Sequence, residues 1–221
     1  MSKTGLPRFL IVGTAKAGTT TIERALAENP AVGLPRKETF FFDHDRMGGA
    51  RLPYPMQRPK DAIITDPEAY RRLYAPFSGK LCVEVGTGYL YHHTVAIPRI
   101  VGTLGADVRI GIILRDPVER TWSSYMHFVK DLHEPLGFRE ALAAEPGRIA
   151  QEWNFMWHYT AMSRYTAQVL AYVEAFPHVR VFFFEDLRSD QPAFLREVCS
   201  FAGVDPDALP IGASAHNPSG V

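Results

Sequence analysis

Residues 9 to 30 read FLIVGTAKAGTTTIERALAENP, an apolar run followed by a glycine-bounded loop and then a helical pattern. This order of strand, loop and helix is typical of a phosphate-binding loop. The nucleoside triphosphate loop has the form G-x-x-x-x-G-K-[ST], in which the lysine contacts the terminal phosphates and the hydroxyl holds magnesium. Gly13 and Gly18 have this spacing, but threonines follow Gly18, and Lys16 lies between the two glycines. The loop therefore predicts an anion site of a different kind.

Apolar and β-branched runs elsewhere in the chain predict further buried strands, and helical patterns lie between them. Strands alternating with helices favour a single α/β domain over residues 1–221, with a central parallel sheet of about four or five strands flanked by helices. Such sheets bind ligands at the carboxyl ends of their strands. We therefore expect the loops after Gly13, Val85 and Leu114 to lie at one edge. The predicted strands are 9–13, 80–86, 108–114 and 179–185, and the predicted helices are 19–28, 67–74, 117–131, 159–176 and 192–202.

The segment from 44 to 66 is rich in proline, glycine and arginine and shows no sustained period. It is expected to be a long surface loop. Loops of this length are often functional, so it either lies near the ligand site or is a simple insertion.

Composition excludes several classes of protein. Lysine plus arginine equals aspartate plus glutamate, at 24 each, so no overall charge favours nucleic acid or an anionic membrane. No segment reaches the roughly 20 apolar residues that cross a bilayer. Cys82 and Cys199 lie in apolar surroundings, which indicates buried, reduced thiols and a cytoplasmic setting. His92 and His93 are adjacent and not at metal-ligand spacing, so no metal site is predicted.

The loop after the first run suits a tetrahedral oxyanion held without a metal. The glycines let the backbone approach a ligand, and the helix after them directs N–H groups and a partial positive charge toward it. Lys16 adds a point charge. In the alternative interpretation, Thr19 only caps the helix and Lys16 is solvated. The candidate binding residues of this loop are Thr14, Lys16, Ala17, Gly18, Thr19, Thr20 and Thr21.

A second motif, ILRDPVERTWSSYMHF, begins at Ile113. Arg115 is predicted to leave its strand at the ligand edge, and Ser123 comes about two helical turns later. An arginine and a serine in this arrangement would hold a second phosphate through the guanidinium fork and the hydroxyl.

Arg120, one turn before Ser123, has a structural interpretation as well. It could pair with Asp116 or Glu119 on the same helix. Considered alone, Arg-Asp-Pro is a common turn from strand to helix, which favours a structural role. Its occurrence together with the first loop favours a binding role for the motif.

Together the two motifs resemble those of the sulfotransferases that use 3′-phosphoadenosine 5′-phosphosulfate. GTAKAGTTTIERAL resembles their 5′-phosphosulfate-binding loop, and LRDPVERTWSSY resembles their 3′-phosphate-binding motif, R-[DN]-P-x-x-R-x-x-S-x-Y. The two occur in this order, about 100 residues apart. A weaker resemblance to the sugar O-sulfotransferase branch, which includes the heparan-type enzymes, extends over nearly the whole chain through RKETFFFD, VEVGTGYL and SRYTAQVLAYVEAFPHVRVFFFEDL.

The resemblance implies transfer of a sulfuryl group from this donor to a hydroxyl or amine, with adenosine 3′,5′-bisphosphate as product and no metal. The acceptor would be a small molecule, a sugar, a lipid or a group bound to a carrier protein. Lys16 would stabilise the bridging oxygen as it leaves. Gly18 and Thr19 to Thr21 would bind the 5′ end of the donor, and Arg115 and Ser123 would bind the 3′-phosphate.

An acceptor hydroxyl also needs a base. Glu38 lies in KETFFFD, which resembles the K-E-x-x-F-F-D stretch that carries a glutamate base in the sugar O-sulfotransferases. It is the favoured candidate. In the alternative interpretation it is a surface glutamate paired with Lys37 or Arg36. Glu84 and His127 are weaker candidates, the first as a buried structural carboxylate and the second as a residue on a helix surface.

The sequence departs from the family pattern in two places. Val85 stands where the sugar-sulfating enzymes often carry a lysine, which makes an anionic sugar acceptor less expected. Family members usually continue through a loop that closes over the nucleotide, and His216, Asn217 and Ser219 would be the remnant of that loop.

Two other functions are kept open. A kinase of small metabolites would need a Gly-Lys pair and a carboxylate to hold magnesium, and Gly18 is followed by Thr19. A nucleotide-binding module without catalysis, part of a larger synthase, would not need Lys16 and Glu38. The sequence does not predict the oligomeric state.

Overall fold

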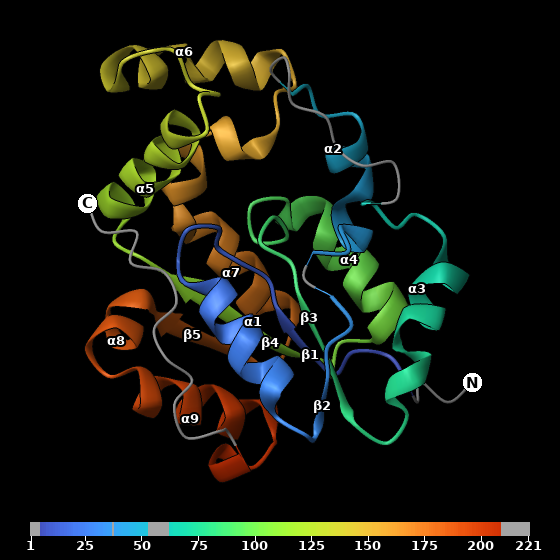
Figure 1. Cartoon of the computed structure of the whole chain (residues 1–221). Helices are drawn as coiled ribbons and strands as arrows, with labels where there is room; N and C mark the ends of the chain where they lie inside the picture. Colours follow the sequence, from blue (N-terminus) through green and yellow to red (C-terminus); the bar gives the residue numbers. More distant parts are fainter. Residues whose placement is uncertain (1–4, 37, 53–61, 209–221) are drawn as a thin grey trace.

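A five-stranded sheet in the order β2-β3-β1-β4-β5 forms the centre of the protein (Figure 1). The computed structural model describes residues 5–36, 38–52 and 62–208. Every strand pairing is parallel, and β1 pairs with β3 on one side and β4 on the other. The predicted parallel α/β fold is confirmed. The strands are β1 (Phe9–Ile11), β2 (Val32–Gly33), β3 (Leu81–Val85), β4 (Arg109–Leu114) and β5 (Val179–Phe183).

Helices connect these strands, and several begin at an aspartate followed closely by proline. Asp66, Asp116 and Asp190 each accept a hydrogen bond from a backbone N–H in the first helical turn, and proline occupies one of the first two helical positions. The helices are α1 (Thr19–Glu28), α2 (His44–Gly48), α3 (Pro67–Tyr74), α4 (His93–Leu104), α5 (Pro117–Lys130), α6 (Phe138–Ala150), α7 (Tyr165–Ala175), α8 (Phe184–Ser189) and α9 (Gln191–Ala202). Short 3-10 helices are η1 (Phe41–Asp43), η2 (Ala75–Phe77), η3 (Phe155–Trp157), η4 (Ala161–Ser163) and η5 (Pro206–Ala208).

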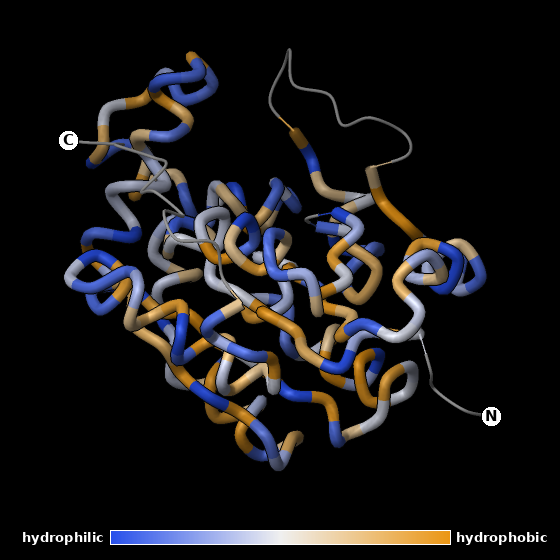
Figure 2. Tube along the Cα trace, turned by 60° about the horizontal axis from the view of Figure 1, so that its bottom comes forward, coloured by the Kyte–Doolittle hydropathy of each residue, from blue (hydrophilic) through white to orange (hydrophobic). Residues whose placement is uncertain are grey.

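Alternation along β1 separates two hydrophobic cores, one on each face of the sheet. Phe9 and Ile11 point to the face covered by α1, α8 and α9, and Leu10 and Val12 point to the face covered by α3, α4 and α7. Figure 2 shows hydrophobic and hydrophilic residues alternating along the outer helices, as expected when one helix face packs against a sheet. Both faces of the sheet are therefore covered, as parallel sheets require.

A third cluster of buried side chains lies beyond the sheet, around α5, α6 and η3. It contains Tyr125 and Phe128 of α5, Ala141 of α6, and Trp157. The rings of Phe128 and Trp157 are stacked, with centroids 3.8 Å apart. This cluster anchors the distal half of α5, and α6 lies at the end of α5 away from the sheet (Figure 1). None of the helices in the described ranges is long and apolar enough to cross a bilayer.

Several predicted boundaries were wrong. Residues 44–48 form α2 and not a loop, and η1 precedes them; residues 53–61 lie outside the described residues. The predicted helix 159–176 is divided into η4 and α7 at Arg164, whose ψ of 73° is not helical. The carbonyl of Tyr159, which precedes η4, accepts a hydrogen bond from the buried side chain of Arg120. The predicted strand 179–185 ends at Phe183, and α8 begins at Phe184. The elements β2, α4, α6 and α8 were not predicted.

Two glycines should respond in opposite ways to replacement by alanine. A Cβ at Gly33 in β2 would lie 2.4 Å from the Cβ of Phe77, whereas a Cβ at Gly102 in α4 would meet nothing within 4 Å. Overpacking should make Gly33→Ala less stable by about 1–3 kcal/mol, and higher helix propensity should make Gly102→Ala more stable by up to about 1 kcal/mol. Urea unfolding of both variants measures the difference. Equal effects of the same sign would contradict this packing.

Candidate functional site

The three loops expected at one edge of the sheet do lie together there. The N–H of Thr14 donates to the carbonyl of Ile113 at 2.8 Å, which joins the loop after β1 to β4. On the other side, the N–H of Leu90 donates to the carbonyl of Val12 at 2.6 Å. The loop after β1 is thus held by its neighbours on both sides.

The two glycines of this loop are required by close packing. Gly13 has φ +149°, and a Cβ there would lie 2.8 Å from the Cβ of Leu90. Gly18 has φ +81°, and a Cβ there would lie 2.5 Å from Cδ2 of Leu187 in α8. Any larger residue would push the loop away from these neighbours, so the glycines fix its path.

The start of α1 has the features of an anion site. Gly18 is the N-cap residue and no side chain caps the helix, so the alternative that Thr19 serves as the cap is wrong. No acidic residue occupies the first turn, so the positive end of the helix is not neutralised by its own sequence. Thr14, Ala17 and Thr19 are buried, and Lys16, Gly18, Thr20 and Thr21 are half-buried along the same loop.

Arg115 joins the second motif to this loop. It lies just after β4, and its Nη1 donates to the carbonyl of Lys16 at 3.2 Å. Its Nη2 contacts Glu119 at 3.1 Å, and its guanidinium lies 4.5 Å from the ring centroid of Phe184. The two motifs, about 100 residues apart in the chain, are therefore in direct contact.

Arg120 has neither of the partners considered from the sequence. Its side chain is fully buried and donates to the carbonyl of Tyr159 and, at 2.6 Å, to Oγ of Ser163. Asp116 instead caps α5, accepting hydrogen bonds from the backbone N–H groups of Val118 and Glu119. Arg120 therefore ties α5 to the segment around η4, which is a structural role.

Ser123 and His127 lie one turn apart on α5. Ser123 is half-buried, while its neighbour Ser124 is buried and donates to the carbonyl of Met156 at 3.2 Å. Partial burial and the positive charge of Lys16 lower the pKa of His127. Its side chain is 43% exposed, and its Nδ1 lies 3.9 Å from Oδ2 of Asp131 on the same helix face.

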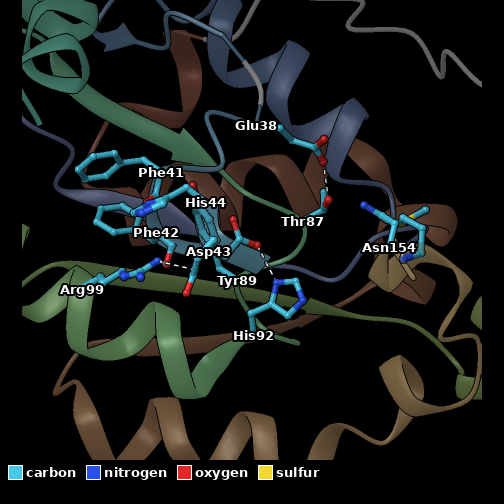
Figure 3. Close-up of polar contacts among 12 residues, drawn as sticks. Glu38, Phe41, Phe42, Asp43, His44, Thr87, Tyr89, His92, Arg99 and Asn154 are labelled. Atoms are coloured by element: carbon cyan, nitrogen blue, oxygen red, sulfur yellow. Dashed lines mark hydrogen bonds and ion pairs between the residues drawn. The ribbon is translucent and has the colours of Figure 1, made fainter. Parts of the chain in front are cut away.

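Glu38 is directed toward the turn after β3. Its N–H donates to the carbonyl of Val85 at 2.9 Å, and its Oε1 accepts a hydrogen bond from the hydroxyl of Thr87 (Figure 3). Phe41 and Phe42 are buried in the core of the α3 and α4 face. The Glu38 carboxylate therefore accepts a hydrogen bond from Thr87. Lys37, considered as a partner from the sequence, lies outside the described residues.

Glu84, the weaker candidate for a base, is fully buried on β3. Burial raises its pKa, and hydroxyl groups donate to both carboxyl oxygens. This surrounding leaves no lone pair for an acceptor hydroxyl, so Glu84 does not serve as the base.

A second pairing at this edge was missed by the sequence analysis. Nδ1 of His92 lies 2.8 Å from Oδ2 of the fully buried Asp43 (Figure 3). Asp43 belongs to the same segment as Glu38, and His92 follows the same turn as Thr87, so two contacts join the segment to the turn. Gly88 permits this approach, because a Cβ there would lie 2.7 Å from Oδ2 of Asp43. A segment with glycine at alternate positions, VGTGYL, was the only signal in the sequence.

His158 lies beside these residues, with Nδ1 3.0 Å from the hydroxyl of Tyr91. Among the described residues, no group of three or more His, Cys, Asp or Glu side chains is arranged to hold a metal ion. His216, Asn217 and Ser219, expected from the sequence to be the remnant of a closing loop, lie outside the described residues.

Stability should fall in mild acid because of His158. Burial lowers the pKa of His158 to about 4, below the 6.5 expected in the unfolded chain. Between these two pH values the unfolded state binds a proton at His158 that the folded state does not bind. The contribution of neutral His158 to folding stability is therefore complete above pH 6.5 and is lost as the pH falls toward 4. The loss should reach about 3 kcal/mol. Urea unfolding from pH 7 to pH 4.5 measures it, and His158→Gln should flatten the dependence. An equally steep dependence in the variant would refute this assignment.

The model of a family described as "Sulfotransferase family" matches residues 7–208. Human heparan sulfate glucosamine 3-O-sulfotransferase 5 is 26% identical over 175 residues, which cover 78% of this chain and 45% of the human protein. The chain thus spans less than half the length of this curated relative.

Solved structures agree with this match. The crystal structure of a sulfotransferase from Alicyclobacillus acidocaldarius superposes with a TM-score of 0.82 at 35% identity, over 96% of this chain and 87% of that one. Mouse sulfotransferase SULT7A1, solved in complex with PAP, superposes with a TM-score of 0.52 at 14% identity, over 93% of this chain and 61% of that one. The second likeness concerns the fold alone.

Proposed function

The chain belongs to the sulfotransferase family, and from this premise we propose that it transfers a sulfuryl group from 3′-phosphoadenosine 5′-phosphosulfate to a hydroxyl or amine of an acceptor. The acceptor would be a small molecule, a sugar, a lipid or a carrier-bound group. The observation that carries the proposal is the hydrogen bond from Arg115 to the carbonyl of Lys16, because it joins a 5′-type and a 3′-type anion motif in one site.

The residues at this edge fit the donor. The uncapped start of α1 and the loop residues Thr14 and Ala17 to Thr21 would surround the 5′ end. Arg115 and Ser123 would bind the 3′-phosphate, the first through its guanidinium and the second through its hydroxyl. Glycine at positions 13 and 18 keeps the loop close enough for backbone contacts.

The mechanism is one of positioning and electrostatic stabilisation. The bound donor supplies an activated sulfuryl group joined to phosphate through a bridging oxygen. Lys16 would stabilise the negative charge that develops on this oxygen as the bond breaks. Glu38 would accept the proton of the acceptor group through its carboxylate, which Thr87 orients.

We also propose that residues 1–221 form one sulfotransferase domain that acts without a metal in a reducing, cytoplasmic setting. Both cysteines are free and buried, which agrees with that setting. None of the comparisons reported above supports a kinase or a non-catalytic module. A kinase loop has lysine after its second glycine, whereas Gly18 is followed by Thr19.

Calorimetric titration with adenosine 3′,5′-bisphosphate in the absence of metal tests the donor site. Binding should be selective over adenosine 5′-monophosphate. Arg115→Ala should weaken it about 10-fold to 100-fold, the cost of a hydrogen bond to a charged group. Arg188→Ala is the matched control, because Arg188 contacts the same Glu119 at 3.5 Å; its effect should stay within about threefold. Binding of only ATP with magnesium would instead indicate a kinase.

Turnover variants test the roles of Lys16 and Glu38. Lys16→Ala should lower the rate of transfer by about 100-fold or more while changing affinity for the bisphosphate modestly, because the charge it meets develops in the transition state. Glu38→Gln should lower the rate about 100-fold, and Glu28→Gln at the exposed end of α1 is its control. Release of bisphosphate from the donor, with 2-naphthol or an N-sulfated glucosamine oligosaccharide as acceptor, measures both. Full activity of Glu38→Gln would remove its role as the base.

A further inference from the structure

The carboxyl group of Glu84 is hydrogen-bonded by four hydroxyl groups inside the protein. Its Oε1 accepts from Thr39 at 2.5 Å and from Tyr89 at 2.6 Å. Its Oε2 accepts from Tyr70 and, at 3.4 Å, from Tyr74. A carboxylate has about four lone-pair positions, so the group is satisfied entirely by these donors. We call these five residues the Glu84 cluster.

The Glu84 cluster joins four separate parts of the fold. Glu84 lies on β3, Tyr70 and Tyr74 on α3, Tyr89 in the turn after β3, and Thr39 just before η1. All five residues are fully buried. Hydrogen bonds in such a low-dielectric surrounding are strong, and losing a donor leaves a costly unsatisfied group. The other members of the cluster therefore fix the position of the Glu84 carboxylate, and this carboxylate fixes the hydroxyl of Thr39.

Thr39 stands between two residues with left-handed backbone conformations. Glu38 has φ 57° and Phe40 has φ 55°. Each such conformation costs about 1–2 kcal/mol in a residue other than glycine and persists only where the surroundings impose it. The hydroxyl of Thr39 contributes to this constraint, since it donates to Glu84 and accepts from the N–H of Phe41 at 3.2 Å. The N–H of Glu38 and the carbonyl of Thr39 are also hydrogen-bonded, to Val85 and Ile64.

We propose that Thr39, anchored by Glu84, is a positioning residue that holds the Glu38 carboxylate toward the acceptor. The inference rests on the proposed role of Glu38 as the base. Glu84 contacts no reactant, because its lone pairs are used within the cluster. A displacement of a reacting group by about 1 Å can cost about 100-fold in rate, so the anchor of this turn controls the rate of transfer.

Three variants separate this role from a contribution to folding. Thr39→Val removes the hydroxyl beside Glu38 with little change of shape, and Thr39→Ser restores a hydroxyl. Tyr74→Phe is the matched control. It removes a hydroxyl group that donates to the same carboxylate, but Tyr74 is far from Glu38 in the sequence. Thr39→Val should lower sulfuryl transfer from the donor to water by about tenfold or more, with affinity for the bisphosphate unchanged. The other two should stay within about twofold.

Amide exchange provides a readout that does not depend on activity. The N–H of Glu38 donates to the carbonyl of Val85 at 2.9 Å. Its exchange with deuterium should become faster in Thr39→Val and should not change in Tyr74→Phe. Equal rates of transfer in these two variants, or unchanged exchange in Thr39→Val, would overturn the inference. Full activity of Glu38→Gln would instead show that the proposed base is wrong, so the two failures are distinguishable.

Discussion

The structure depends on the backbone hydrogen bonds that hold the loop after β1 from both sides. β1 is the central strand, so its end is fixed by β4 through Thr14 and by the turn after β3 through Leu90. Because the loop cannot shift relative to either neighbour, the start of α1 has a defined position at the carboxyl edge of the sheet. Arg115 and the turn that carries Thr87 therefore lie at fixed positions relative to this loop.

Most of the sheet and the anion loop could be predicted because their signals are local. Apolar runs identified four strands, and glycine spacing identified the loop between Gly13 and Gly18. The missed elements lack such signals. β2 has only two residues, and α4 contains a proline at position 98. The end of the predicted helix 159–176 was right to within one residue, but its start was wrong because Arg164 has a non-helical backbone conformation, with ψ 73°.

The polar part of the candidate site was less predictable because its contacts join distant segments. Asp43 and His92 are 49 positions apart, and Thr39 and Glu84 are 45 apart. Periodicity reports which residues are buried, and does not report which side chains meet. A carboxylate in a buried apolar strand, as in LCVEV, does indicate that some donors must surround it. It does not identify them, and three tyrosines and a threonine have no common sequence pattern.

The burial of Arg120 has an electrostatic consequence. Its hydrogen bonds go to neutral groups, and burial lowers its pKa to about 10. The charges of Tyr165 and Glu145 oppose this shift, and Arg115 has a smaller effect in the same direction as burial. The guanidinium is still charged at neutral pH, so α5, the helix that follows Arg115, carries a buried positive charge. Mobile salt ions cannot screen a charge that water does not reach. An anion bound at the edge of the sheet would be attracted by this charge, so occupancy and folding would be thermodynamically linked.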